Sequence, residues 1–466
     1  MENYDVAIIG SGPGGYVAAI RGAQLGFKTV IIEKYDTLGG TCTNVGCIPT
    51  KALLDSTHHY ADARNNFKIH GINLNEINLD FSQMYKRKSE VVGKNTSGLE
   101  FLMSKNKITR LQGVARFINN STLEITGKEG VQTIVAKNYI IATGSKPSTI
   151  PGIVIDKRRI ITSTEALALQ EKPKTMVIIG GGVIGVEMAS IFNRMGTQVT
   201  ILEYADRLIS TMDHELGKNL QKILKKEGID IHLNQSVYKA ENIGSSANVF
   251  FRDEKGKENV MEAEYVLMAV GRRPYTEGLG LENTNVELDQ RGFIKVNEKC
   301  QTSVSAIYAI GDVIGGAMLA HKAEEEGVLV AETIGGQNHH IHYSRIPSVV
   351  YTWPEVASVG YTEEYLKNNQ IEYKAGKFPF SASARARASM DTEGFAKVLV
   401  DPKYGEVLGV HIIGARAADL VAQAVIAQEF EVTAEDMFRI SYAHPTYSET
   451  LKEAYLIASG QGAINI

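Results

Sequence analysis

The sequence predicts an α/β fold built from two similar strand–turn–helix units and a C-terminal α+β domain. A glycine-rich unit begins at Gly10 and returns at Gly180 with the same internal spacing. After about Ile346 the glycine fingerprint is absent and short alternating strands replace it. The chain of 466 residues also exceeds the size at which a single hydrophobic core stops growing, so several domains are expected.

The composition narrows the class of protein. The chain is 44% hydrophobic and 22% charged with a formal net charge of −4, so we expect no nucleic acid as a partner. No stretch supplies the roughly 18 uncharged apolar residues of a membrane-spanning helix. The N-terminal stretch MENYDVAIIG carries an acid where a signal peptide needs positive charge. We therefore expect a cytoplasmic protein with no membrane partner.

The first unit is an apolar strand that leads into Gly10-x-Gly12-x-x-Gly15, a helix of small residues, and a second strand that ends at Glu33. This order is typical of a Rossmann-like dinucleotide-binding domain. The glycines allow a tight turn, close approach of backbone N–H groups to a pyrophosphate, and close helix–strand packing. The closing acid can accept hydrogen bonds from a ribose.

The second unit repeats the fingerprint at Gly180, Gly182 and Gly185 and closes at Glu203. In each unit the closing acid follows the first glycine by 23 residues, so two unrelated strand–turn segments are a weak alternative. A carboxylate at Glu203 would repel a 2′-phosphate, and no arginine adjoins it. We therefore expect NAD rather than NADP at this unit.

Cys42 and Cys47 follow the first unit in the segment GGTCTNVGCIPTK. Structural zinc needs four ligands, and no second cysteine or histidine pair completes the set, so no metal is expected. We interpret the pair as a dithiol/disulfide couple, with two inert buried cysteines as the alternative. Residues five apart in a straight helix have Cα atoms roughly 8.6 Å apart, too far for a disulfide. The helix must therefore be distorted, and Gly46 and Pro49 supply the distortion.

A further cofactor is expected to connect these sulfurs to the nicotinamide. A nicotinamide delivers hydride rather than exchanging electrons with sulfur, so a flavin between them is the economical arrangement. The first unit is therefore predicted to bind FAD and the second NAD. A helix start near the cysteines is also expected to lower a thiol's pKa.

Two further strand ends belong to the same scheme. The run YIIATGSKP closes the first unit, and AIYAIGD presents Asp312, which would bind sugar-like hydroxyls or serve only as a turn residue. The remaining cysteine, Cys300, is expected to pack in a core.

The predicted domains are an FAD-binding domain at 1–146, an NAD-binding domain at 147–270, a central domain completing the FAD site at 271–345, and a dimerisation or interface domain at 346–466.

The C-terminal domain is predicted to contain a helix from Ala418 to Gln428. Near its end, YAHPTYSET places His444 before a proline and Glu449 five residues later. The structural alternative is a capping box from Thr446 to Glu449, with His444 an ordinary loop residue. A thiol–disulfide enzyme, however, needs a base that works near neutral pH, and histidine is suited to that task.

The motifs GGTCTNVGCIPTK, ATGSKP, GRRPY, AIGDV and HPTYSE and the doubled glycine fingerprint span nearly the whole chain. In this the sequence resembles the class I pyridine nucleotide–disulfide oxidoreductases. The resemblance implies a homodimer that oxidises protein-bound dihydrolipoamide to lipoamide and reduces NAD+ through a redox-active disulfide and FAD. Its partner would be a lipoyl-bearing acyltransferase or carrier of a 2-oxo acid dehydrogenase or glycine cleavage complex. The alternatives are a related NAD(P)H-dependent disulfide reductase and a non-catalytic, nucleotide-responsive redox sensor.

The resemblance also implies roles for individual residues. Cys47 would face the flavin and Cys42 would exchange with substrate, while His444 of the other subunit, oriented by Glu449, would act as the base. The implied FAD contacts are Gly10, Gly12, Gly15, Glu33, Lys51, Ala115, Thr143, Gly144, Ser145, Asp312 and Ala320. The implied NAD contacts are Gly180, Gly182, Gly185, Glu203, Val237 and Gly271.

Lys51 and Glu187 match an ion pair beside the flavin ring in the same family. Only the resemblance distinguishes them from surface or helix-end charges. Ala115 stands where a glycine is frequent, so only backbone contacts are expected there.

Overall fold

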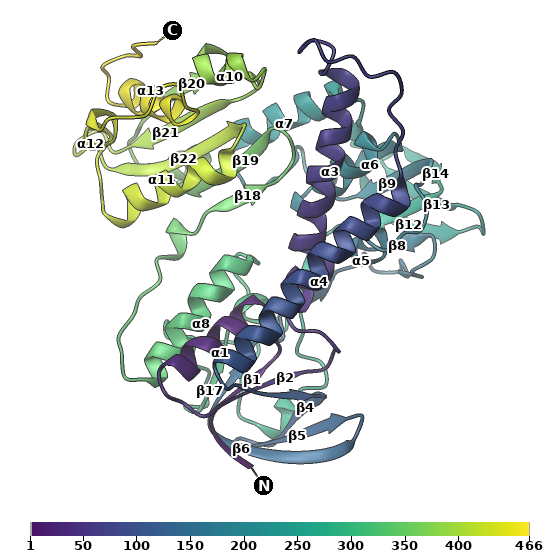
Figure 1. Cartoon of the computed structure of the whole chain (residues 1–466), viewed down its shortest axis with the longest axis vertical. Helices are drawn as coiled ribbons and strands as arrows, with labels where there is room; N and C mark the ends of the chain where they lie inside the picture. Colours follow the sequence, from purple (N-terminus) through teal and green to yellow (C-terminus); the bar gives the residue numbers. More distant parts are fainter. Residues whose placement is uncertain (1, 466) are drawn as a thin grey trace. The chain divides into compact units, whose positions relative to one another are not determined.

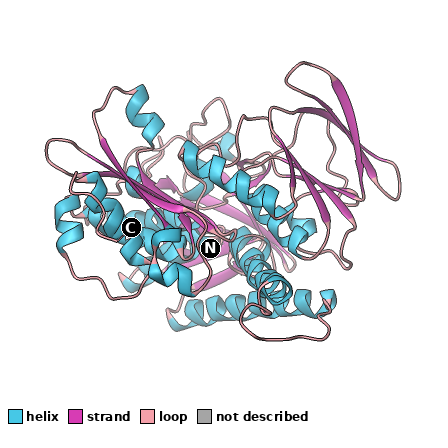
Figure 2. Ribbon diagram, turned by 90° about the horizontal axis from the view of Figure 1, so that it is seen from above, coloured by secondary structure: helices cyan, strands magenta, loops and turns pink. Residues whose placement is uncertain are grey.

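The computed structural model describes residues 2–465, which form two compact units. The first unit comprises the chain up to Leu53 together with Asp80–Ser148 and Gly271–Ile341. The second comprises Leu54–Leu79, Thr149–Val270 and the chain from His342 onward. Helices and strands are mixed in both units, which confirms the predicted α/β class (Figures 1 and 2). This division is coarser than the four predicted domains, whose boundaries stay a prediction.

The first unit is built on a mixed sheet. Its strands are β1 (Glu2–Ile9), β2 (Thr29–Glu33), β3 (Thr109–Gln112), β4 (Val114–Asn119), β5 (Thr122–Gly127), β6 (Gly130–Ile141) and β17 (Ile307–Ala309). They follow the order β3-β2-β1-β6-β5-β4, and β17 pairs in parallel with β6. The pairs around β1 are parallel, whereas β5 and β4 are antiparallel to their neighbours. The run from Val6 to Ile9 is buried throughout, as is usual for apolar strands of parallel sheets.

Helices accompany this sheet. They are α1 (Pro13–Gln24), α2 (Gly40–Val45), α3 (Cys47–Asn65), α4 (Phe81–Lys105) and α8 (Ala320–Ile334), with α3 running on into the second unit. Helices α1 and α8 lie side by side (Figure 1). Their backbones approach closely at Gly14 and Gly327. A Cβ on Gly327 would lie 2.6 Å from the Gly14 carbonyl oxygen, so this approach requires a glycine. The shorter elements are β7 (Ser145–Pro147) paired with β16 (Arg272–Pro274), and the 3-10 turns η1 (Leu281–Asn283) and η2 (Gly311–Ile314).

The second unit contains a parallel sheet that begins with the second glycine fingerprint. Its strands are β8 (Ile160–Ile161), β9 (Thr175–Ile179), β10 (Gln198–Leu202), β11 (Asp230–His232) and β15 (Tyr265–Met268), in the order β11-β10-β9-β15-β8. Each neighbouring pair in this order is parallel. The sheet is accompanied by α5 (Ser163–Ala166), α6 (Val183–Arg194) and α7 (His214–Lys226). A separate antiparallel ladder consists of β12 (Ser236–Asn242), β13 (Ala247–Arg252) and β14 (Glu258–Ala263).

The C-terminal part of the second unit is an antiparallel sheet with helices, as predicted. Its strands are β18 (Ser348–Val350), β19 (Glu355–Gly360), β20 (Lys374–Pro379), β21 (Phe395–Val400) and β22 (Val407–Gly414), in the order β18-β19-β22-β21-β20. Its helical segments are η3 (Tyr343–Arg345), α9 (Glu363–Asn368), η4 (Phe380–Ala382), α10 (Ala384–Ala388), α11 (Ala417–Glu429), α12 (Ala434–Arg439) and α13 (Ser448–Ala458). Helix α11 extends one residue beyond each end of its predicted range. Within residues 2–465, no helix has both the length and the apolar character to span a bilayer.

Candidate active site

The first glycine turn joins β1 to α1. Gly10 has φ 101°, a left-handed conformation that favours glycine. A Cβ on Gly15 would lie 2.0 Å from the Gly10 carbonyl oxygen, so the strand and helix approach this closely only without a side chain. At Gly12, where α1 begins, a Cβ would meet no protein atom within 4 Å. This open space at a helix N-terminus fits a phosphate that approaches the backbone N–H groups.

The second glycine turn joins β9 to α6 with the same geometry. Gly180 has φ 109°, and a Cβ on Gly185 would lie 2.0 Å from the Gly180 carbonyl oxygen. Gly182, at the start of α6, also faces open space. The repeat in the sequence is therefore also a repeat in three dimensions, and both turns fit a dinucleotide pyrophosphate.

Each closing acid lies beside its own turn. Glu33 is 5% exposed and accepts hydrogen bonds from the Ser11 backbone N–H at 3.0 Å and the Ser11 hydroxyl at 2.6 Å. Glu203 accepts hydrogen bonds from the backbone N–H of Gly181 and, at 2.6 Å, from that of Ala205. Both carboxylates are thereby fixed at the edge of a turn, the place from which such an acid binds a ribose.

The helix between the two cysteines is broken, as predicted. Helix α2 ends at Val45, Gly46 has φ −136° and ψ −114°, and α3 begins at Cys47. The side chain that Gly46 lacks would lie 2.8 Å from the Thr41 carbonyl oxygen and 3.2 Å from the Cα of Cys42. Glycine at this position therefore allows the two cysteine-bearing segments to pack against each other.

The two sulfur atoms interact directly. Cys42 is a thiol that hydrogen-bonds to Cys47. This bond and burial raise the pKa of Cys42, and the nearby charge of Lys51 offsets only part of the increase. The pKa lowering expected from a helix start is thus wrong for Cys42, because the sulfur–sulfur hydrogen bond and burial outweigh it. Cys42 keeps its proton at neutral pH and needs a base to become a nucleophile.

Asp312 is part of a polar network in the first unit. Ser145 donates its hydroxyl to the Asp312 carboxylate, and Arg272 donates to the Ser145 hydroxyl at 2.7 Å. The Arg272 Nε atom lies 3.8 Å from an Asp312 oxygen. Burial lowers the pKa of the Arg272 guanidinium, whereas the negative charges of Asp312 and Cys47 oppose that effect. The network brings a positive charge into electrostatic reach of Cys47.

His444 lies in the turn before α13. Its Nδ1 atom is 2.9 Å from Glu449 Oε1, and its side chain is 72% exposed. Partial burial raises the pKa of Glu449, but hydrogen bonds from the Thr446 backbone N–H and from His444 outweigh it and leave the pKa below its usual value. The ionised carboxylate therefore orients the imidazole through Nδ1, and proton transfer at Nε2 stays a prediction. The alternative capping box forms only in part: the Thr446 backbone N–H donates to the Glu449 carboxylate at 2.8 Å, whereas the Thr446 hydroxyl donates to the Ala443 carbonyl and the N-cap of α13 is Tyr447.

Comparison with known families identifies the chain. The pyridine nucleotide-disulphide oxidoreductase family matches residues 4–327, and the dimerisation domain of that family matches residues 346–455. The chain belongs to the pyridine nucleotide-disulphide oxidoreductases. The resemblance expected from the motifs is therefore confirmed, and the protein is an oxidoreductase.

Curated relatives narrow the group within the pyridine nucleotide-disulphide oxidoreductases. The chain is 48% identical over 467 residues to the mitochondrial dihydrolipoyl dehydrogenase of Caenorhabditis elegans, covering 100% of this chain and 94% of that protein. It is 47% identical over 455 residues to that of Pisum sativum, covering 97% and 91%. The dihydrolipoyl dehydrogenase of Trypanosoma brucei brucei is 47% identical over 457 residues, covering 97% and 95%. The expected similarity to dihydrolipoamide dehydrogenase is confirmed.

Solved structures share the fold over nearly the whole chain. The HOCl-induced flavoprotein disulfide reductase RclA from Escherichia coli is 28% identical with a TM-score of 0.86, covering 97% of this chain and 99% of that one. LpdA from Mycobacterium tuberculosis is 23% identical with a TM-score of 0.90 and the same coverage, which shows the fold alone.

Membership in the pyridine nucleotide-disulphide oxidoreductases also bears on the cofactors and the assembly. Dihydrolipoyl dehydrogenases of this family use FAD and NAD, the two cofactors predicted for the glycine turns. The match to the dimerisation domain supports the predicted homodimer. Among residues 2–465, no group of three or more His, Cys, Asp or Glu side chains is arranged to hold a metal ion.

The other predicted residues fall in several elements. Glu187, in α6, is 3% exposed and accepts a hydrogen bond from the Tyr351 backbone N–H at 2.9 Å. Lys51 belongs to the first unit and Glu187 to the second, and their pairing stays a prediction. Ala115 in β4 and Val237 in β12 are 5% and 8% exposed, and Ala320 is the first residue of α8. The Thr143 hydroxyl donates a hydrogen bond of 2.7 Å to the Tyr275 carbonyl. Gly144 and Gly271 have φ values of 69° and 110°. Cys300 is 1% exposed in a core cluster, as expected for packing.

The sequence motifs assign no role to Arg272, although it lies within GRRPY. Its partner Ser145 is 127 residues earlier in the chain, so only the fold brings the two together. A pair of adjacent arginines at a strand end could have marked the position, but nothing in the sequence indicates which of the two faces Asp312.

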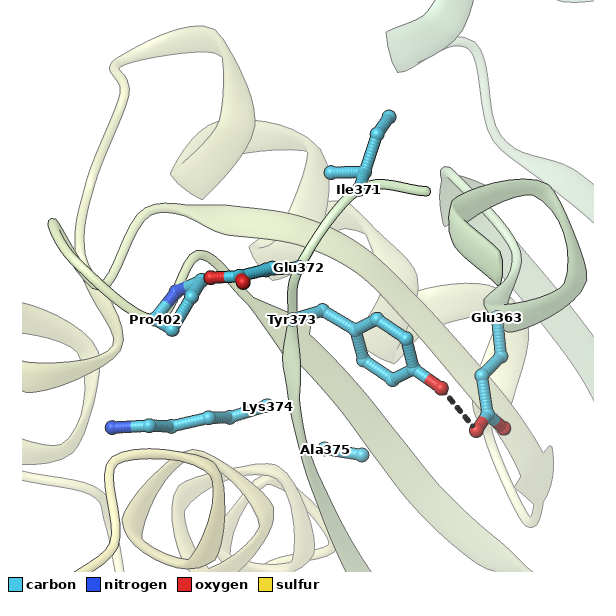
Figure 3. Close-up of a pocket in the computed structure, with 7 residues that line it drawn as sticks. All are labelled: Glu363, Ile371, Glu372, Tyr373, Lys374, Ala375 and Pro402. Carbon is cyan, nitrogen blue, oxygen red and sulfur yellow. Dashed lines mark hydrogen bonds between the residues drawn. The ribbon is translucent and has the colours of Figure 1, made fainter. Parts of the chain in front are cut away.

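A surface hollow of about 620 Å3 lies in the C-terminal part. Figure 3 shows the Tyr373 side chain directed toward the Glu363 carboxylate, to which its hydroxyl donates a hydrogen bond of 2.7 Å. The lining residues are Glu363, Ile371, Glu372, Tyr373, Lys374, Ala375 and Pro402, and none of them is a predicted site residue. We assign the hollow no part in the redox chemistry.

Proposed function

We propose that the chain oxidises dihydrolipoamide carried on a partner protein and reduces NAD+. The observation that supports this most is the sulfur pair at the break between α2 and α3, in a chain that is 47% and 48% identical to two dihydrolipoyl dehydrogenases over nearly their full length. The balance is one dithiol oxidised to a disulfide and one NAD+ reduced to NADH, with release of one proton. Bound FAD supplies the two-electron connection between the enzyme's sulfur pair and the nicotinamide.

The cysteines would carry out thiol–disulfide exchange. Starting from the Cys42–Cys47 disulfide, a substrate thiolate attacks the sulfur of Cys42, and Cys47 leaves as a thiolate. The second substrate thiolate then attacks the substrate sulfur of the mixed disulfide, which releases Cys42 and closes the lipoamide ring. Lys51 near Cys42 and Arg272 near Cys47 provide positive charge that stabilises thiolates.

His444 would move the protons of this exchange. Its imidazole takes a proton from the incoming dithiol, and Glu449 stabilises the cation that forms. We propose that the imidazole serves the cysteine pair of the other subunit. The family's dimerisation domain and the 72% exposure of the His444 side chain support this arrangement.

The FAD and NAD contacts named from the motifs are part of the same proposal. Gly10 to Gly15 and Glu33 would hold FAD with Asp312, and Gly180 to Gly185 with Glu203 would hold NAD. The two open helix N-termini at Gly12 and Gly182 support these assignments.

The partner would be a lipoyl-bearing subunit of a 2-oxo acid dehydrogenase or glycine cleavage complex. The names of the relatives support a lipoyl substrate, and the choice between the complexes stays open to measurement. The cytoplasmic location also stays a prediction, and several relatives are named as mitochondrial enzymes.

A steady-state assay tests the function. The purified chain should be yellow, and it should reduce NAD+ with dihydrolipoamide much faster than NADP+. Glutathione disulfide should be a poor oxidant of NADH, and Cys42→Ser should abolish the dihydrolipoamide reaction. Preference for glutathione disulfide would support the related reductase, and nucleotide binding without turnover would support the redox sensor.

A further inference from the structure

Asp391 joins two segments that are far apart in the sequence. It lies in the loop between α10 and β21. One carboxylate oxygen accepts a hydrogen bond of 3.1 Å from the Trp353 indole N–H, and the other accepts one of 2.7 Å from the Tyr447 hydroxyl. Each oxygen of the carboxylate therefore holds a donor from a different loop of the second unit.

The Tyr447 end of this connection borders the catalytic turn. Tyr447 is the residue from which α13 begins, and Glu449 lies in the first turn of that helix. The Tyr447 hydroxyl is also 2.5 Å from the Ser389 hydroxyl. A hydroxyl bonded to two groups on the same loop fixes the start of α13, and with it the carboxylate that orients His444.

The Trp353 end is anchored independently. The Trp353 ring packs on the His58 ring of α3, with 4.5 Å between the ring centroids. The residues on either side of it, Thr352 and Pro354, are buried and joined by a hydrogen bond of 2.8 Å from the Thr352 hydroxyl to the Pro354 carbonyl. Asp391 therefore connects the catalytic turn to a packed, hydrogen-bonded segment between β18 and β19.

Such a connection matters because the base itself is exposed. The His444 side chain is 72% exposed, and the hydrogen bond that it donates to Glu449 is what orients its ring. The transfer of a proton depends on placement to within a fraction of an ångström, which requires a second set of contacts behind the reacting group.

We propose that Asp391 is a positioning residue for the His444–Glu449 base, acting through Tyr447. The inference rests on the proposed function, because it concerns the base of that reaction. Asp391 touches neither substrate nor cofactor in this proposal.

The variant Asp391→Asn tests it in the intact holoenzyme. We expect kcat/KM for dihydrolipoamide to fall about tenfold, and the acid limb of its pH profile to shift relative to the unaltered chain. The reduction of ferricyanide by NADH, which needs no proton transfer to or from a substrate thiol, should stay unchanged. Tyr447→Phe should have the same effects, and the double variant should lose little more than either single variant because both break one connection.

Glu393→Gln is the matched control. Glu393 lies two residues from Asp391 on the same loop but forms an exposed ion pair with Lys226 at 2.7 Å. It should keep both activities and the pH profile.

Three results would overturn the proposal. The first is an unchanged dihydrolipoamide reaction in Asp391→Asn and Tyr447→Phe. The second is an equal loss of the dihydrolipoamide and ferricyanide reactions, which would indicate a purely structural role. Should Asp391→Asn fail to fold, Tyr447→Phe decides by the same criteria. The third is the absence of any dihydrolipoamide oxidation by the unaltered chain. That result would refute the proposed function itself, so it is distinguishable from the first two.

Discussion

Glu33 and Glu203 occupy the same place in two similar turns but are expected to serve different cofactors. Each accepts a hydrogen bond from a backbone N–H of its own glycine turn, at Ser11 and Gly181 respectively. The local contacts alone therefore do not distinguish the two sites. The distinction comes from the cysteine pair, which belongs to the same unit as Glu33.

Paired substitutions separate the two assignments. Glu203→Gln should raise KM for NAD+ about tenfold and weaken discrimination against NADP+, because the ribose diol loses a charged acceptor. Glu33→Gln should instead lower the FAD content of the purified protein. The measurements are NAD+ and NADP+ kinetics and the flavin-to-protein absorbance ratio. Loss of flavin from the Glu203 variant with an unaffected Glu33 variant would reverse the assignment.

At the scale of residues, the sequence was most informative where the chemistry is local. The glycine turns, Cys42 and Cys47 and the His444–Glu449 pair all lie within short motifs, and the structure brings each pair together. A helix start was expected to lower the pKa of a thiol in this segment, whereas the pKa of Cys42 is raised. The hydrogen bond that raises it depends on the geometry of the helix break, which the sequence does not specify.

The break between α2 and α3 leads us to expect that a side chain at Gly46 destabilises the protein. Gly46→Ala places a Cβ 2.8 Å from the Thr41 carbonyl oxygen, and it should destabilise the protein by about 1–3 kcal/mol and slow the dihydrolipoamide reaction. Gly93→Ala, in the exposed middle of α4, meets no atom within 4 Å and should stabilise the protein by about 0.5–1 kcal/mol. Thermal unfolding of both holoenzymes measures the difference. Equal effects at the two positions would contradict the role of Gly46.

Helix α7 is tied to the C-terminal sheet by buried charge. Its N-cap residue Asp213 is 0% exposed and pairs with Lys397 of β21 at 2.8 Å. Burial raises the pKa of Asp213, but the charges of His411 and Lys397 outweigh it, so the pKa lies below its usual value. Because burial also lowers the pKa of His411, Lys397 is the cation that matters at neutral pH.

This pair predicts a pH dependence of stability. A carboxylate with a lowered pKa in the folded state stabilises it above the unfolded value of about 3.9, and the contribution is lost as pH falls through the lower folded value. Asp213→Asn should therefore cost about 3 kcal/mol at neutral pH by leaving Lys397 without this buried partner. The gap in Tm between the two proteins should narrow below about pH 4. A gap that stays constant with pH would contradict this linkage.

Elements were predictable where their patterns are strong, and their connections were not. The helix from Ala418 to Gln428 was correct to one residue at each end. The Asp213–Lys397 pair joins residues 184 apart, and the Ser145–Arg272 bond residues 127 apart. Local periodicity carries no information on such pairs, which depend on how whole sheets and helices pack.

At the scale of the molecule, the proposed exchange of His444 between subunits is open to a complementation test. Co-expression of Cys47→Ser and His444→Gln subunits should restore activity that neither homodimer has. Random pairing makes about half of the dimers mixed, each with one intact site of two, so about a quarter of full activity is expected. If the histidine served its own subunit, no dimer would contain an intact site and the mixture would stay inactive.

The first unit is assembled from three separate stretches of the chain, and this affects how it is made. Strand β6 pairs with β17, which follows it by about 170 residues, and α1 packs against α8, which follows it by some 300 residues. While a ribosome is still producing the intervening second Rossmann-like fold, the flank of β6 and one side of α1 are bare. During synthesis, this unit should therefore become resistant to protease only after α8 has left the ribosomal exit tunnel. No single continuous fragment of the chain can contain this unit without part of the second one.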